Sequence, residues 1–119
     1  MVDVERFTAA LARTPALAKR VFTDREIELS GGAATRPASL AARWAAKEAV
    51  AKVLVDNRGH QWHDCQILNG PLGEPILALT GTVLAAAEAR GIDAWHMSLS
   101  HDGGVAIAFV LATGRGPGQ

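Results

Sequence analysis

The sequence predicts an α+β domain in which an antiparallel sheet packs against one long helix. Helical patterns fill the first half of the chain, and two hairpin patterns fill most of the second half. The longest helical signal is an alanine-rich segment over residues 38–55. The order of helices, hairpin, helix and hairpin is typical of α+β proteins with an antiparallel sheet.

The composition fits a single globular domain. The 119 residues are 49% hydrophobic and 20% charged, and the formal net charge of zero argues against a dedicated nucleic-acid binder. No apolar run approaches the roughly 18 residues needed to cross a membrane. The chain opens with charged residues and has one cysteine, Cys65, which fits a reducing compartment. We expect a cytoplasmic protein with one domain over residues 1–112 and a disordered tail over 113–119.

Three shorter helical segments precede the long helix. Residues 5–14 place apolar side chains at i, i+3 and i+4 spacing. A second helix is expected after Thr14, which would cap it, with Pro15 at the first helical position. Thr23 and Glu26 have the spacing of a capping box, which predicts the start of a third.

The second half reads as strands and one helix. The last strand pattern alternates, so Met97 and Leu99 are expected on one face and His96, Ser98 and Ser100 on the other. The expected elements are strands over 65–68 and 75–80, a helix over 82–90, a strand over 95–100, a turn over 101–104 and a strand over 105–111.

The long helix raises the functional question, because it carries charges among small apolar residues. Glu48 and Lys52 are four residues apart, so their side chains are neighbours, and Arg43 and Lys47 form a second such pair. A solvated surface pair explains this spacing, since most helix charge patterns are exposed. A site for Mg²⁺ and a phosphate ligand explains it as well, because Mg²⁺ takes one or two carboxylates plus waters and phosphate oxygens.

Three blocks of the sequence resemble the holo-acyl-carrier-protein synthases, which are small phosphopantetheinyl transferases. Residues 42–54 (ARWAAKEAVAKVL) resemble their signature helix. Residues 5–26 resemble their N-terminal helices and Phe-Thr-x-x-Glu element, and residues 95–112 resemble their C-terminal hairpin with its Ser-x-Ser-His turn. The blocks occur in family order and span nearly the whole chain, which makes the resemblance specific.

The resemblance implies a Mg²⁺-dependent transfer of 4′-phosphopantetheine from coenzyme A (CoA) to a serine of apo acyl carrier protein. Adenosine 3′,5′-bisphosphate is the implied second product. It also implies a phosphopantetheinyl transferase-like fold and a homotrimer with each CoA site between neighbouring subunits. No nucleic acid or membrane partner is implied.

The resemblance also assigns residues. Glu48 matches the metal-binding glutamate, and it is our candidate for the base that activates the serine, directly or through a metal-bound water. Lys52 matches the lysine near the CoA phosphates, and Arg43 matches the arginine at the nucleotide phosphate end. The remaining expected CoA contacts are Lys47, Ser98 and His101. The expected contacts with the carrier protein are Arg6, Arg13 and Arg20.

One part of the family pattern is missing. The family begins with a strand that carries a second metal-binding aspartate six residues before the arginine matched by Arg6, and that position falls before Met1. Asp3 lies at the place of a neighbouring acidic residue. We therefore expect either a start that lies upstream of Met1 or a protein without this strand and ligand. The second case motivates an alternative function, a catalytically impaired relative that binds CoA or carrier protein without transfer.

Overall fold

The computed structural model describes residues 1–32, 36–55 and 59–116. The helices are α1 (Val4–Arg13), α2 (Leu17–Val21), α3 (Asp24–Leu29), α4 (Pro37–Leu54), the 3₁₀ helix η2 (Trp62–Asp64) and α5 (Gly81–Ala89). The strands are β1 (Val2–Asp3), β2 (Cys65–Asn69), β3 (Pro75–Leu79), β4 (Ile92–Asp102) and β5 (Val105–Gly114).

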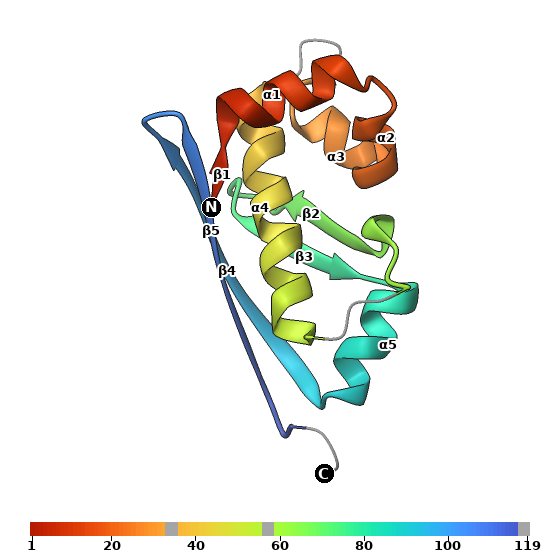
Figure 1. Cartoon of the computed structure of the whole chain (residues 1–119). Coiled ribbons are helices and arrows are strands. Elements are labelled where there is room, and N and C mark those ends of the chain that lie inside the picture. The colour runs from red at the N-terminus through yellow and green to blue at the C-terminus, as the bar shows by residue number, and fades with distance from the viewer. Residues whose placement is uncertain (33–35, 56–58, 117–119) are drawn as a thin grey trace.

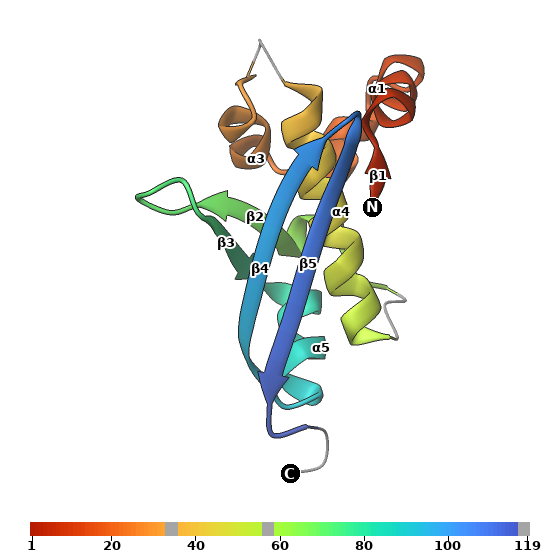
Figure 2. The same cartoon turned by 90° about the vertical axis from the view of Figure 1, so that its left-hand side faces the viewer.

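The long helix α4 lies in the middle of the molecule (Figure 1). One side of it packs against the β4–β5 hairpin, whose sheet has the order β1-β5-β4. Its other side faces the separate two-stranded sheet of β2 and β3. Helices α1 to α3 gather around the N-terminal end of α4, and α5 lies near its C-terminal end (Figures 1 and 2).

Small side chains on α4 let it approach the sheet closely. Ala41, Ala45 and Ala46 are almost fully buried, and Ala41 and Ala45 pack with Val2 and Ala106 of the sheet. A second cluster joins the C-terminal half of α4 to β2 and α5, and a third joins its N-terminal half to α2. Burial of this apolar surface, at about 25 cal/mol per Å², is the main force that holds α4 in place.

The predicted fold class is confirmed, and most predicted elements lie within a few residues of the observed ones. The Thr23 capping box is present: its hydroxyl accepts from Glu26 N, and the Glu26 carboxylate accepts from Thr23 N. The alternation in β4 is also confirmed, because Met97 and Leu99 pack against the core while His96, Ser98 and Ser100 are exposed. The Gly and Pro residues of the segment over 30–37 predict a loop there, and this segment falls partly outside the described residues.

Several predicted boundaries were wrong. Helix α2 begins at Leu17 with Ala16 at its N-cap, so neither Thr14 nor Pro15 starts it. Strand β4 continues to Asp102 and β5 to Gly114, because the two strands pair along their whole length. The start of the expected tail, Thr113 and Gly114, is therefore ordered in the sheet, and residues 117–119 lie outside the described part of the chain.

The first residues of the chain form a short strand at the edge of this sheet. Val2 and Asp3 form β1, which pairs antiparallel with Ala106 and Val105 of β5. The Asp3 side chain caps α1 by accepting a hydrogen bond from Arg6 N at 3.0 Å. Asp3 therefore has a structural task at the start of a helix.

The outer face of the β4–β5 hairpin carries exposed apolar side chains. Ile107, Phe109 and Leu111 of β5 are 47%, 65% and 48% exposed. They lie across from Ser100, Ser98 and His96 of β4.

Within the described residues, no helix is long and apolar enough to cross a membrane.

Candidate functional site

Helix α4 presents Glu48 and Lys52 to a groove beside β5. Met1, Ala45, Ala49 and the β5 residues 108–110 line the rest of it. Glu48 is half-buried and Lys52 is exposed. Neither has an ion-pair partner within 4.0 Å among the described residues. The groove, which we call the Glu48 groove, therefore offers a free carboxylate and a free ammonium group to a ligand.

A second groove opens on the side of α4 that faces β2 and β3. Arg43 and His101 both line it, although they are 58 positions apart in the sequence. His101 reaches this groove because β4 extends past it and places it on the same face as Leu99. The expectation of a turn at His101 was wrong for this reason. The other residues of this Arg43 groove include Arg36, Ser39, Asn69 and Pro75.

Arg43 is 5% exposed and is held by three acceptors. Its Nε atom donates to the carbonyl oxygen of Ile67 at 3.0 Å, and its terminal nitrogens donate to Ser39 Oγ at 3.0 Å and Asn69 Oδ1 at 2.9 Å. Burial lowers the pKa of the guanidinium from its usual value, while the nearby Glu26 charge opposes that shift. Each terminal nitrogen keeps a second hydrogen for a ligand in the groove.

Lys47 points into the protein interior. Its ammonium group pairs with Glu26 Oε1 at 2.9 Å, and both side chains are fully buried. It also donates to the carbonyl oxygen atoms of Trp62, at 3.0 Å, and of Cys65. An ammonium group with three protein acceptors has no hydrogen left for a phosphate. The structure therefore argues against Lys47 as a CoA ligand, and we leave it out of the proposed site.

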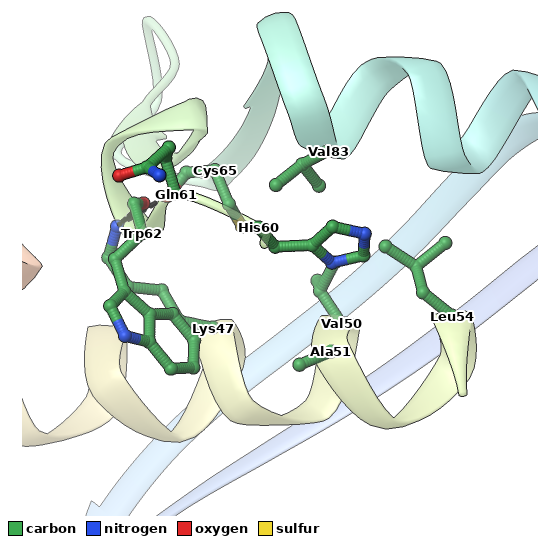
Figure 3. A pocket seen from close by; sticks show the side chains of 9 residues that line it. All are labelled: Lys47, Val50, Ala51, Leu54, His60, Gln61, Trp62, Cys65 and Val83. Carbon is green, nitrogen blue, oxygen red and sulfur yellow. Dashed lines mark hydrogen bonds between the residues drawn. The ribbon is translucent and has the colours of Figure 1, made fainter. Parts of the chain in front are cut away.

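A separate cavity of about 200 Å³ lies between α4 and α5 (Figure 3). The side chains of Trp62 and His60 border it on different sides, and α4 forms its floor. None of Glu48, Lys52, Arg43 and His101 lines this cavity. The lining residues are Lys47, Val50, Ala51, Leu54, His60, Gln61, Trp62, Cys65 and Val83.

The remaining predicted residues are on the surface. Ser98 is exposed on the outer face of the hairpin and is not among the residues that line either groove. Arg6 and Arg13 on α1 and Arg20 on α2 are all exposed. Helix α1 crosses the N-terminal end of α4 (Figure 1), which makes these side chains part of one end of the molecule.

Sequence reasoning missed the part that Glu26 plays. Its position in a capping box was predicted, but its carboxylate also reaches Lys47 and the backbone N–H of Ile67, at 3.0 Å. These partners lie 21 and 41 positions away in the sequence. Local spacing gives no signal for them, because they meet only when α3, α4 and β2 pack together.

The described residues can hold Mg²⁺ only with help from a ligand. They contain no group of three or more His, Cys, Asp or Glu side chains that could bind a metal ion. Glu48 is the single carboxylate that lines its groove. One carboxylate is compatible with Mg²⁺ when substrate phosphates and waters complete its shell. The donor set thus fits an ion that arrives with a phosphate substrate.

Comparison with known proteins decides the family. The sequence model of the 4′-phosphopantetheinyl transferase superfamily matches residues 2–110. The chain belongs to this superfamily. It is 58% identical to the holo-[acyl-carrier-protein] synthase of Salinispora arenicola (strain CNS-205) over 112 residues, which cover 94% of this chain and 92% of that relative. It is 52% identical to the synthase of Streptomyces coelicolor over 114 residues, covering 96% and 93%.

Solved structures of the superfamily share the fold. The crystal structure of Helicobacter pylori holo-[acyl-carrier-protein] synthase in complex with coenzyme A matches with a TM-score of 0.81 and 27% identity, covering 94% of this chain and 95% of that one. The Chronobacterium ammoniagenes ACPS–CoA complex matches with a TM-score of 0.80 and 27% identity, covering 96% and 93%. These matches confirm the phosphopantetheinyl transferase-like fold that the sequence predicted.

Cys65 of this superfamily member is a buried thiol at the edge of the cavity. It is 3% exposed. Burial raises its pKa to about 11, the Glu26 charge adds to this shift and the Lys47 charge opposes it. The folded protein therefore keeps a proton that the unfolded chain loses near pH 9. The free energy of unfolding should therefore decrease as the pH rises from about 9 to about 11.

The same shift predicts an unreactive thiol. At pH 8 we expect iodoacetamide to alkylate native Cys65 at least about 100-fold more slowly than the unfolded chain, because the thiolate is the nucleophile. Since Cys65 is the only cysteine, intact mass in the presence and absence of denaturant gives both rates directly. Equal rates in the two states would contradict the burial and raised pKa of this thiol.

Proposed function

We propose that this protein is a holo-[acyl-carrier-protein] synthase that transfers 4′-phosphopantetheine from CoA to a serine of apo acyl carrier protein. The single observation that carries the proposal is the free Glu48–Lys52 pair in a groove of a chain that belongs to the superfamily along nearly its whole length. The two structural matches whose titles name a CoA complex support CoA as the donor substrate.

The reaction joins the serine oxygen to the phosphorus of the phosphopantetheine arm and breaks the pyrophosphate bond of CoA, which releases adenosine 3′,5′-bisphosphate. Such transfers depend on positioning and charge neutralisation. Glu48 would hold Mg²⁺, and a bound ion would neutralise charge on the pyrophosphate. Glu48 is also our candidate for the group that takes the serine proton.

The cationic residues supply the rest of the proposed CoA site. Lys52 lies one helical turn from Glu48 and can neutralise phosphate charge in the same groove. Arg43 and His101, in the other groove, would bind the nucleotide end of CoA. Ser98, on the outer face of the hairpin, is a proposed further contact.

The separation of the two grooves supports a homotrimer. Within one chain, Glu48 and Lys52 line a groove beside β5, whereas Arg43 and His101 line one beside β2, β3 and β4. A single CoA can meet both sets when the Glu48 groove of one subunit adjoins the Arg43 groove of the next. The exposed Ile107, Phe109 and Leu111 give the apolar surface that such an assembly would bury.

Exposed arginines support the proposed contact with acyl carrier protein. Arg6, Arg13 and Arg20 are free to meet an acidic partner at the end of the molecule formed by α1 and α2. A reduced, buried Cys65 and a soluble CoA substrate support a cytoplasmic location.

Replacement of Glu48 tests the proposed transfer. Wild-type protein incubated with CoA, Mg²⁺ and apo carrier protein should add one phosphopantetheinyl group, detected by intact mass. Glu48→Gln keeps the side-chain size and removes the charge, so the rate should fall by at least about 100-fold. The matched control, Glu88→Gln on the exposed face of α5, should retain the wild-type rate.

Two outcomes would contradict this assignment. Full activity in Glu48→Gln would remove Glu48 from the site. A wild-type protein that binds CoA in calorimetry but adds no mass to the carrier protein would favour the alternative, a binding relative without transfer.

Charge reversal at Arg6 tests the docking surface. Arg6→Glu should raise KM for the carrier protein by about tenfold or more and leave KM for CoA unchanged, because Arg6 is exposed and lines neither proposed CoA groove. Added salt should raise KM for the carrier protein in the wild type, because it screens the attraction between the arginines and an acidic partner. Arg115→Glu, at an exposed position directly after the C-terminal end of β5, serves as the control. Equal changes in both variants would contradict a dedicated docking role for Arg6.

A charge on the hairpin face tests the trimer. Leu111→Asp, at a position that lines neither groove, places a carboxylate in the apolar surface and should convert the assembly to monomers in sedimentation or light-scattering measurements. The monomer should also lose CoA binding, because its two grooves no longer meet. Leu72→Asp, at a 93% exposed position in the β2–β3 turn, should leave the assembly intact. A wild-type protein that is itself monomeric would refute the proposal.

A further inference from the structure

Charged side chains form hydrogen bonds with the backbone of β2 along the edge that faces away from β3, which we call its outer edge. Strand β2 has β3 on one side, and among the described residues no strand covers its other edge. The groups on that edge are nevertheless satisfied: Ile67 N donates to Glu26 Oε2 at 3.0 Å, and the Ile67 carbonyl accepts from Arg43 Nε at 3.0 Å. Lys47 donates to the Cys65 carbonyl on the same edge. Three ionised side chains thus take the place of a neighbouring strand.

Glu26 is the anion that makes this arrangement possible. Its Oε1 atom accepts from Thr23 N at 3.0 Å and lies 2.9 Å from Lys47 Nζ, while Oε2 accepts from Ile67 N. The side chain is 0% exposed and lines neither groove, so it cannot touch a ligand there. Without it, the buried Lys47 ammonium group would lose its ion-pair partner, and Arg43 would lose the nearby negative charge that opposes the lowering of its pKa.

Glu26 is linked to Arg43 through a single residue. Ile67 receives Glu26 at its N–H and Arg43 at its carbonyl, so the position of this one backbone segment sets where the guanidinium lies. Asn69, two residues further along β2, holds a terminal nitrogen of the same guanidinium. The hydrogen bonds from Arg43 to Ile67 and Asn69 of β2 therefore fix the orientation of the guanidinium, and the hydrogen bond from Ile67 to Glu26 holds this part of β2 in place.

We propose that Glu26 is a positioning residue for CoA binding, which acts through Ile67 to hold Arg43 in its groove. This inference rests on the proposed function, since it takes CoA as the ligand of Arg43. It assigns a task in the reaction to a residue of α3 that makes no contact with either groove.

Glu26→Gln tests the proposal. All three partners of the carboxylate are donors, so the amide nitrogen of Gln must face one of them and the bridge between Lys47 and Ile67 is lost. KM for CoA should rise by about tenfold, the usual scale for an outer positioning partner. KM for the carrier protein should stay unchanged. Glu28→Gln is the matched control, because Glu28 lies on the same helix but is exposed and pairs with Arg25 across 3.3 Å.

A double-mutant cycle separates positioning from general stability. In an Arg43→Ala background, Glu26→Gln should change KM for CoA by less than about twofold, because the guanidinium that Glu26 positions is no longer present. A residue that serves only the fold would produce the same factor in both backgrounds. That result, or an unchanged KM in folded Glu26→Gln, overturns the proposal.

Two further measurements cover the other outcomes. If Glu26→Gln does not fold, Glu26→Gln with Lys47→Met removes both charges and should fold with the same loss of CoA affinity; failure of both variants to fold would make Glu26 purely structural and overturn the proposal. Titration of each variant with CoA in a calorimeter gives the dissociation constant without turnover. A wild type that binds CoA but transfers nothing would refute the proposed function while these constants still decide the role of Glu26.

Discussion

The close packing of α4 against the β4–β5 hairpin is the constraint on which the rest of the structure depends. Alanines at the contact let the helix backbone approach the sheet, and they determine which side chains turn outward. Successive turns of one helix then send Glu48 and Lys52 to one groove, Arg43 to the other and Lys47 into the interior. A bulkier residue at Ala41 or Ala45 would shift all of them together.

Buried charge is the second organising feature, and it connects the fold to the site. An isolated ion in the interior is costly, yet Glu26 and Lys47 offset that cost by pairing with each other. Both also bind the edge of β2 that β3 does not cover, as does Arg43. The same contacts that complete this edge also orient Arg43 toward its groove. Under the proposed function, stability and CoA binding share one network, through which a residue outside the grooves would influence them.

The prediction of elements from sequence succeeded where signals were local. The Thr23 capping box and the alternation around Met97 and Leu99 depend on neighbours within a few residues, and both are confirmed. Errors arose where pairing between strands overrides local preference. His101 and Asp102 resemble a turn in sequence, but they pair with Ala106 and Val105 and extend β4. The expectation that Thr113 and Gly114 are disordered was wrong for the same reason, because both residues pair with β4 and complete β5.

The sequence by itself determined the fold class, the superfamily resemblance and the spacing that makes Glu48 and Lys52 neighbours, because these follow from short-range periodicity and ordered motifs. Only the tertiary structure decided that Lys47 is buried. It lies on the same helix as Lys52, yet it pairs with Glu26 in the core. The tertiary structure alone also brought His101 to Arg43 and Ile67 between Glu26 and Arg43. These residues are 21 to 58 positions apart in the sequence, and they come together only when separate elements pack.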